Sequence, residues 1–466
     1  MERRWQVLAV VSVAVFMAGL DLFIVNIAFP DIERDFKGSS VATISWVLNA
    51  YAIVFAALLV PAGRLADRVG RRRAFLAGLL VFVAGSVLCG VAPSVVTLVA
   101  ARVLQAVGAA FLLPTSLALL LPEFPPQERA AAIGIWAAAG GVAAAAGPPL
   151  GGLLVEASWR WVFLVNVPVG LGAYIFAARL LRESRDERQE RPDLVGTAVL
   201  TITIGLLALG LVKAPDWEWT DGRTVLALVA SGVGLAVFWA RCLSHPVPVV
   251  EPSMLRVRSF AMANTASLLF AAAFAAMLLA SVLFLTGVWG DSVLAAGVSL
   301  APGPAMAAVF APIAGRLANR VGQSRLAATG LTLFAFGCAW WLWRVDATRD
   351  YAAELLPGLL LTGIGVGLTL PSLASAAAAS LPPARFATGS AVLTMSRQIG
   401  FVLGVAILVA VLGTVDDSDP VSAFQGGWLF MIIAAAAAVV AAMSIGEIGQ
   451  EAPTAKVVPV TSESVS

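Results

Sequence analysis

Two ionisable residues lie inside long apolar runs, and one of them, an aspartate, has the chemistry needed to carry a proton across a membrane. Asp21 lies late in the first apolar run of the chain, and Arg102 lies early in the fourth. An ionised aspartate inside a membrane helix costs about 2.5–3.5 kcal/mol, so it needs a cationic partner or a water-filled cavity. Burial disfavours the charged form of an aspartate, whereas a nearby cation favours it. We therefore predict that Asp21 is the proton carrier; the alternative is a hydrated, structural aspartate near the outer interface.

The elements that position these residues are predicted to be membrane-spanning helices. Hydrophobic residues make up 60% of the chain and charged residues 12%, with a mean hydropathy of +0.91. An ordinary soluble domain carries about 25% charged residues. A spanning helix needs about 20 apolar residues. Runs of that kind predict fourteen helices, at 7–29, 46–63, 75–92, 96–121, 131–155, 161–181, 194–213, 224–243, 260–287, 294–315, 326–344, 354–381, 388–413 and 427–446. The sequence thus predicts an all-α integral membrane protein.

The distribution of basic residues predicts how these spans are oriented. Loops rich in Lys and Arg stay on the cytoplasmic side of a membrane. If the amino terminus lies in the cytoplasm, most of the 30 basic residues fall on the inner side. The exceptions are two within spans, Arg102 and Arg397, and seven on the outer side, Arg34, Lys37, Arg160, Lys213, Arg223, Arg344 and Arg349. We therefore expect a multi-pass protein of a bacterial cytoplasmic (inner) membrane with both termini in the cytoplasm.

A repeated motif indicates that the chain contains two similar halves. Residues 63–73 read GRLADRVGRRR between two apolar runs, and residues 315–322 read GRLANRVG in the same setting. The segments 107–115 and 365–372 also parallel one another, and each precedes a loop that contains proline. Transporters are commonly built from repeats of this kind, with the substrate site at the interface between them.

The repeat predicts four parts of the chain. We expect six-helix bundles at residues 1–181 and 259–446. Residues 182–258 between them would form a charged cytoplasmic linker plus two additional transmembrane helices. Residues 447–466 are rich in Pro, Val, Ser and Thr and are expected to form a disordered cytoplasmic tail.

These motifs resemble those of the major facilitator superfamily and, within it, of the fourteen-span drug:proton antiporters. Residues 20–30 are similar to the family's first-helix motif, with Phe29 in place of the more usual leucine, and residues 63–73 to the superfamily's loop motif. Residues 102–108 are similar to the fourth-helix motif, with Ala106 where glycine is common. The fifth span resembles the antiporter motif through Gly140, Gly147, Pro148, Gly151 and Gly152. The resemblance covers residues 5–445.

The resemblance implies a proton-coupled secondary transporter that exports amphipathic or cationic drugs or toxic compounds by alternating access. It places Arg102 in the central cavity near the first helix, where the guanidinium would hold Asp21 deprotonated and Gln105 would orient it. The alternative for Arg102 is an arginine at the outer end of its span that reaches to water. The antiporter motif implies export rather than import. A dedicated carrier for one lipid, siderophore or metabolite is the alternative function.

The loop motif is predicted to act as a conformational latch on the cytoplasmic side. Asp67 and Arg71 can pair if the turn is helical, because they are four residues apart. The resemblance implies that Asp67 lies near the start of the equivalent helix of the other half, and Glu123 is expected to pair with Arg71 or Arg72. Asn319 in the second copy implies a one-sided latch. The expected latch residues are Gly63, Asp67, Arg68, Gly70, Arg71, Arg72 and Glu123.

Polar and aromatic residues on the spans beside the expected cavity are candidate substrate contacts. They are Asn26, Trp46, Asn49, Tyr51, Gln105, Arg397 and Gln398. Each could instead face a neighbouring helix, and Arg397 could be an anchor at the cytoplasmic end of its span. Loosely specified apolar contacts would tolerate many ligands. The expected partners are the lipid bilayer, protons and hydrophobic or cationic small molecules.

Other classes of function find no support in the sequence. The three cysteines lie far apart, and a lone histidine, His245, cannot form a metal site. The chain contains no Walker-type loop and no HExxH sequence. We therefore expect no enzyme activity, no metal, no cofactor, no nucleic-acid binding and a monomeric state.

Overall fold

The computed structural model describes residues 2–125, 128–185, 192–382, 385–413 and 420–446, which fold into helices. The first part of the chain forms α1 (Arg3–Asp35), α2 (Val41–Ile44), α3 (Trp46–Val69), α4 (Arg71–Gly90), α5 (Val95–Leu120), the short η1 (Leu121–Glu123), α6 (Arg129–Ala157), α7 (Trp161–Leu164) and α8 (Asn166–Leu180). Two further helices follow, α9 (Leu194–Trp217) and α10 (Gly222–Ser244). The last part forms α11 (Pro252–Leu255), α12 (Arg258–Gly287), α13 (Val293–Leu300), α14 (Pro302–Val321), α15 (Gln323–Arg344), η2 (Tyr351–Leu355), α16 (Leu356–Ala379), α17 (Phe386–Leu412) and α18 (Pro420–Met443).

Fourteen helical segments in the described ranges are long and apolar enough to cross a membrane, which confirms the predicted number. Several extend beyond the apolar runs from which they were predicted. The first helix, for example, continues through Pro30 to Asp35. Helix propagation depends on backbone hydrogen bonds as well as on side-chain hydropathy, so polar flanking residues can prolong a span. The predicted tail and linker residues 186–191 lie outside the described residues.

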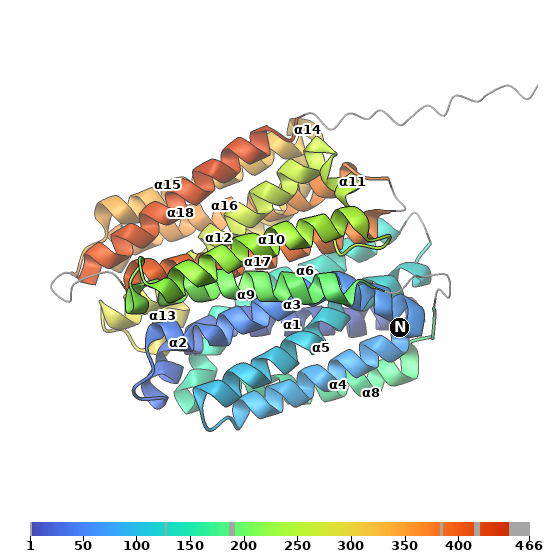
Figure 1. Cartoon of the computed structure of the whole chain (residues 1–466), viewed down its shortest axis with the longest axis horizontal. Helices are drawn as coiled ribbons and strands as arrows, with labels where there is room; N and C mark the ends of the chain where they lie inside the picture. The colour runs from blue at the N-terminus through green and yellow to red at the C-terminus, as the bar shows by residue number, and fades with distance from the viewer. Residues whose placement is uncertain (1, 126–127, 186–191, 383–384, 414–419, 447–466) are drawn as a thin grey trace, which may run out of the picture.

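The helices pack in two groups that repeat the same set of neighbours (Figure 1). In the first group α1 packs on α6, α3 on α5, and α4 on α5 and α8. In the second group α12 packs on α17, α14 on α16, and α15 on α16 and α18. The groups meet where α3 contacts α17 and where α6 contacts α13 and α14. Helices α9 and α10 pack on each other, and α9 contacts both α3 and α17.

Glycine pairs let equivalent helices approach closely in both groups. A Cβ atom built on Gly108 of α5 would lie 2.7 Å from the carbonyl oxygen of Gly78 on α4. A Cβ atom built on Gly365 of α16 would lie 2.6 Å from the carbonyl oxygen of Gly330 on α15. Small residues at a helix interface allow backbones to touch in this way. The two halves therefore share a packing detail as well as a sequence motif.

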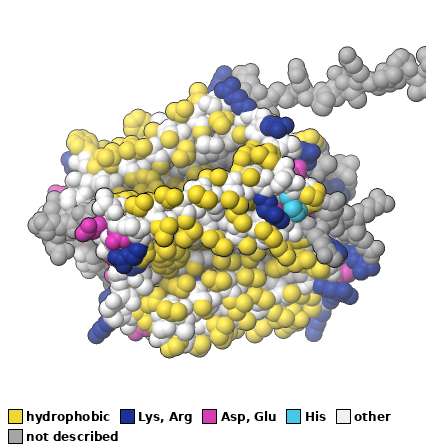
Figure 2. All heavy atoms as spheres, in the orientation of Figure 1, with side chains coloured by type: hydrophobic (Ala, Val, Ile, Leu, Met, Phe, Trp, Pro, Cys, Tyr) yellow, Lys and Arg dark blue, Asp and Glu magenta, His cyan; other side chains and the backbone are white. Residues whose placement is uncertain are grey.

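The surface of the molecule is apolar between two charged ends. Figure 2 shows hydrophobic side chains over the middle of the visible face, while Lys, Arg, Asp and Glu gather toward the ends of the helices. Exposed apolar side chains are found on α4, α9, α10 and α18, among them Leu88, Ile202, Leu226 and Val440. Such a surface is stable against lipid tails, because contact with them keeps its apolar side chains out of water.

Candidate functional site

A buried ion pair joins the first span to the fourth. Arg102 of α5 donates from Nη1 to Oδ2 of Asp21 on α1, and the two side chains are 1% and 0% exposed. Neither residue lies at an end of its helix, and both are shielded from solvent. Asp21 and Arg102, which stand out in the sequence as charges within apolar runs, are thus direct partners in the structure.

Neutral side chains occupy the remaining carboxylate oxygen. Gln105 donates from Nε2 to Oδ1 of Asp21 at 2.8 Å, and Asn166 of α8 donates from Nδ2 to the same oxygen at 3.3 Å. Gln105 also donates to the hydroxyl of Ser86 on α4 at 2.8 Å and accepts from Arg102 at 2.6 Å. Ser86 and Asn166 were missed by the sequence analysis. A small polar residue within an apolar run is common in membrane helices, so nothing in the sequence singles them out.

The Arg102 guanidinium makes three further contacts within the first half. Its Nε donates to the carbonyl oxygen of Val47 on α3 at 3.0 Å. Its planar group lies 4.1 Å from the ring centroid of Tyr51 and 5.6 Å from that of Phe163. Cation–π contacts of this kind stabilise a cation further when water is excluded. Five helices and the short α7 therefore converge on one ion pair.

The other predicted cavity residues are not hydrogen-bonded to this network within the described part of the chain. Asn26 donates to the carbonyl oxygen of Leu22 on its own helix at 3.0 Å, and Trp46 is half-buried. Asn49 is fully buried, and both its amide nitrogen and its amide oxygen are without a described partner. The Tyr51 hydroxyl, Arg397 Nε and Gln398 Oε1 are buried and likewise lack a partner among the described residues. All of these unsatisfied atoms lie on α3 and α17, two helices that meet between the halves.

The loop motif folds into a compact cluster at the end of the molecule that carries the amino terminus. Arg71 donates from Nε to Oδ1 of Asp67 at 2.6 Å, which is the pairing that their spacing predicts. Gly70 has φ +115° and is the N-cap residue of α4. A Cβ atom there would lie 2.7 Å from the carboxylate of Glu183, which accepts from the backbone N–H groups of Arg72 and Arg73. A carboxylate is favoured at a helix N-terminus, where unpaired N–H groups point outward.

The predicted pairing of Glu123 with Arg71 or Arg72 is replaced by other contacts. Glu123 pairs with Arg3 at 2.9 Å, not with Arg71 or Arg72, because α1 begins beside the end of α5. Arg72 instead donates to the carbonyl oxygen of Ala178 at 2.7 Å. Arg68 is exposed, and Gly63 packs against Pro114, whose Cβ would lie 3.2 Å from an added Cβ.

The contact that reaches the second half is made by a neighbouring residue of the same motif. Arg64 lies 3.6 Å from Glu251, and Glu251 lies 3.9 Å from Arg385, which precedes α17. Arg64 also donates to the carbonyl oxygen of Pro248 at 2.9 Å. Asp67 was expected to make the contact across the halves, but its hydrogen bond is to Arg71 within the first half.

The glycines of the fifth span lie against helices of both halves. A Cβ atom on Gly147 would lie 2.8 Å from Cβ of Phe23, and one on Gly151 would lie 3.0 Å from Ile24 and Ile27 of α1. On another side of α6, a Cβ atom on Gly152 would lie 3.0 Å from Leu294 of α13. The backbone oxygen of Pro148 faces Gly297 of α13, where an added Cβ would lie 2.5 Å away, whereas Gly140 has space around it.

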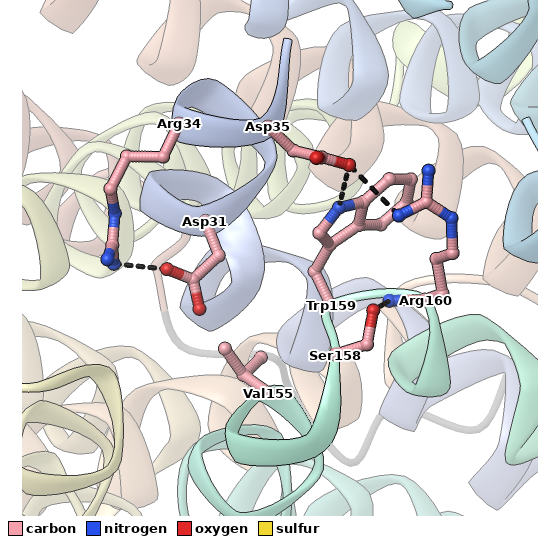
Figure 3. Close-up of a pocket in the computed structure, with 7 residues that line it drawn as sticks. All are labelled: Asp31, Arg34, Asp35, Val155, Ser158, Trp159 and Arg160. Atoms are coloured by element: carbon pink, nitrogen blue, oxygen red, sulfur yellow. Dashed lines mark hydrogen bonds and ion pairs between the residues drawn. The ribbon is translucent and has the colours of Figure 1, made fainter. Parts of the chain in front are cut away.

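A polar hollow of about 340 Å³ opens at the opposite end of α1 (Figure 3). Asp35 accepts hydrogen bonds from Trp159 Nε1 at 2.8 Å and from Arg160 Nη1 at 2.9 Å. Arg34 pairs with Asp31 on the other side of the hollow. None of the predicted cavity residues lines it. In the described ranges no group of three His, Cys, Asp or Glu side chains is placed to hold a metal ion.

Comparison with known proteins gives a consistent set of relatives. The family model of the Major Facilitator Superfamily matches residues 11–303 and 265–461. The chain is 35% identical to the multidrug resistance protein Stp of Mycobacterium tuberculosis, over 88% of this chain and 76% of that protein. It is 33% identical to the tetracenomycin C resistance and export protein of Streptomyces glaucescens, over 90% and 78%. It is 31% identical to the multidrug export protein EmrB of Escherichia coli, over 85% and 78%.

Solved structures show the same fold at low sequence identity. The crystal structure of the nucleoside transporter NupG superposes with a TM-score of 0.66 at 13% identity, covering 96% of this chain and all of that one. A bacterial homologue of the human lysosomal transporter Spinster, in an inward-facing conformation, superposes with a TM-score of 0.61 at 19% identity, covering 96% and 98%.

Proposed function

Because the chain belongs to the major facilitator superfamily, we propose that it is a proton-coupled secondary transporter that exports amphipathic small molecules by alternating access. It is a multi-pass membrane transporter of the multidrug-efflux type rather than an enzyme. Proton coupling is the part of this proposal that depends on the geometry of the chain itself.

The observation that carries the proposal is the buried Asp21–Arg102 pair. Asp21 is a carboxylate in the interior of a span, and Arg102 with its two amide neighbours stabilises the ionised form. A proton that binds Asp21 neutralises the carboxylate and leaves the buried Arg102 guanidinium without a counter-charge, which is costly. Protonation is therefore tied to a rearrangement of α1 against α5. Such a link between a proton and the arrangement of the helices is what antiport needs.

Alternating access would occur between two bundles, which we place at residues 1–181 and 259–446, with residues 182–258 as an inserted linker and helix pair. The seams at α3–α17 and α6–α13 support this division, since contacts there join otherwise separate groups. The cluster of Asp67, Arg71 and Glu183 would stabilise the shape of the loop at one end. Arg64 and Glu251 would supply the contact that is broken and remade.

The proposed orientation has both termini in the cytoplasm of a bacterial inner membrane, and the proposed functional unit is a monomer. The end that carries Arg3 also carries the arginine-rich loop motif at 63–73. Basic loops of this kind favour the cytoplasmic side. Bacterial relatives support the placement in a bacterial membrane.

The substrate range has two candidates. The relatives named for multidrug resistance favour broad export of amphipathic compounds, including cationic drugs. The relatives named as a tetracenomycin C export protein and a probable actinorhodin transporter favour a dedicated exporter of one metabolite. Competition between chemically unrelated compounds for transport separates the two, because a dedicated site excludes most of them.

The test is uptake of ethidium into inside-out proteoliposomes that carry an imposed proton gradient. We expect the native chain to accumulate ethidium in a manner abolished by a protonophore, and Asp21→Asn to lose that accumulation. Asp31→Asn, a matched change at the far end of the same helix, should retain it. Gradient-driven accumulation by Asp21→Asn equal to that of the native chain would move the proton site elsewhere.

A further inference from the structure

A second arginine in the membrane interior has no described counter-charge. Arg397 lies near the middle of α17, and its Nε atom is buried without a hydrogen-bond partner among the described residues. None of the ion pairs found in those residues includes it, and no Asp or Glu occurs between Glu354 and Asp416. Arg102, by contrast, has a carboxylate, two oxygen acceptors and two aromatic rings around it.

The neighbours of Arg397 place it close to where the two halves meet. Phe401 is four residues further along α17 and so lies on the same side of the helix. Its ring lies 5.9 Å from that of Phe274 on α12, and the Phe274 ring lies 6.2 Å from that of Phe23 on α1. Phe23 belongs to the first half, so this aromatic row crosses between the halves. Arg397 therefore lies about one helical turn from the row, toward the amino-terminal end of the molecule.

Residues close to Arg397 on α17 contact α12 of the same half. Ser396 donates to Asn264 of α12 at 3.0 Å, and a Cβ atom on Gly400 would lie 2.8 Å from Ala271 of the same helix. Arg397 is rotated by about 100° from Ser396. The adjacent Gln398 also has a buried amide oxygen without a described partner. Of these two side chains, Arg397 has the unpartnered hydrogen-bond donor, whereas the free atom of Gln398 is an acceptor.

An unpaired guanidinium in a membrane interior is costly, and such residues mark substrate or ion pathways. The carboxylate of Asp21 cannot serve it in this arrangement, because Arg102, Gln105 and Asn166 already occupy both oxygens. The same occupation leaves Asp21 with little attraction for a cationic substrate. Among the described residues near the middle of the spans, Arg397 therefore contributes a positive charge without a counter-ion.

We propose that Arg397 binds the anionic group of the substrate, so that amphipathic aromatic acids are preferred over lipophilic cations of similar shape. A guanidinium donates two parallel hydrogen bonds to a carboxylate, and this geometry gives specificity as well as affinity. Phe23, Phe274 and Phe401 pack in a row about one turn away, so the surroundings of Arg397 are aromatic, as an aromatic acid would require. The inference rests on the proposed transport function and changes the class of substrate expected from the sequence.

The test is equilibrium binding of two dyes that share a xanthene core to the purified full-length chain. Rhodamine 110 carries a free carboxylate, and rhodamine 123 is its methyl ester. Fluorescence anisotropy should show tighter binding of the carboxylate dye to the native chain. Arg397→Gln should weaken binding of the carboxylate dye by about tenfold or more and leave binding of the ester nearly unchanged. Arg397→Lys should retain part of the preference, because it keeps the charge and loses the planar fork. Arg344→Gln, the same change at an exposed site, should alter neither.

Several outcomes would overturn this assignment of Arg397. One is an equal loss of binding affinity for both dyes in Arg397→Gln, which is the result expected if Arg397 has only a structural role. Another is tighter binding of the ester than of the carboxylate dye to the native chain. If Arg397→Gln is not monodisperse, Arg397→Lys decides, because an unchanged dye preference there contradicts a bidentate contact. Binding is measured without a gradient, so gradient-driven export of the ester without any carboxylate preference would overturn this inference and keep the proposed function. A preference for the carboxylate dye without gradient-driven transport of either dye would keep this inference and overturn the proposed function.

Discussion

The carboxylate of Glu251 lies 3.6 Å from the guanidinium of Arg64, and this pair connects α3 of the first half to the segment that leads into the second. Glu251 also lies 3.9 Å from Arg385 at the start of α17. One acidic side chain thus holds arginines from both halves at the amino-terminal end of the molecule. Its place in the segment after α10 means that the inserted helix pair contributes to the contact between the halves.

Removing this charge should loosen the amino-terminal end. Glu251→Gln is expected to shift the distance between spin labels at Arg68→Cys and Ala379→Cys toward longer values, in a chain whose three native cysteines are buried. Partly exposed pairs are worth about 0–1 kcal/mol each, so the shift in population should be modest. Glu156→Gln at the opposite end serves as the control. Identical distance distributions in Glu251→Gln and the native chain would show that the pair does not hold the halves together.

Breaking the buried pair should cost stability that its double replacement restores. Arg102→Gln leaves the Asp21 carboxylate buried without its cation and should lower the free energy of unfolding by about 3–5 kcal/mol. The double variant Asp21→Asn with Arg102→Gln should be more stable than Arg102→Gln alone, because no charge is then left unpaired. Thermal unfolding in detergent measures both. Strictly additive effects of the two changes would contradict a direct interaction.

Two glycines of one helix should respond differently to alanine. Gly147→Ala places a Cβ atom 2.8 Å from Cβ of Phe23, whereas at Gly140 the nearest atom, Cγ1 of Val15, would be 4.0 Å away. Overpacking costs about 1–3 kcal/mol, and an unhindered glycine-to-alanine change in a helix gains about 0.5–1 kcal/mol. The melting temperature should therefore fall for Gly147→Ala and stay level or rise for Gly140→Ala. The reverse order would show that α6 packs against α1 through a different face.

The hairpin of α9 and α10 should lose stability in acid. Burial alone would raise the pKa of Asp193, but hydrogen bonds from Arg241, at 2.8 and 2.9 Å, and from the Gly196 N–H hold that pKa below its usual value. A lowered carboxylate pKa contributes stability above the unfolded value of about 3.9. That contribution is lost as the pH falls through the folded value.

Replacing Asp193 tests this pH dependence. Asp193→Asn should reduce the free energy of unfolding by about 1–2 kcal/mol at pH 7, through the lost ion pair and helix cap. The difference from the native chain should shrink as the pH is lowered below about 4, because the native aspartate is then protonated too. Melting temperatures at several pH values supply the measurement. A difference that stays constant down to the lowest pH would assign the effect to packing instead.

The sequence predicts the number of spans and the two residues of the buried pair, because both depend on local patterns. An apolar run of sufficient length becomes a helix in a membrane, and a charge inside it stands out. The partners of Asp21 on α4 and α8 were not predictable in this way, since Ser86 and Asn166 matter only through how helices pack. Glu123 shows the same limit, because its proximity to Arg3 follows from the approach of α1 to the end of α5.

The paired glycines of α4–α5 and α15–α16 bear on how the molecule deforms. In each pair one backbone rests on another, with Gly78 against Gly108 and Gly330 against Gly365. A contact between backbones cannot be widened or narrowed by changing a rotamer, unlike a contact between side chains. Each half is therefore stiff across this one helix pair. Movement is then expected mainly at the contacts between the halves, where helices such as α3 and α17 can slide over one another without separating these glycine pairs.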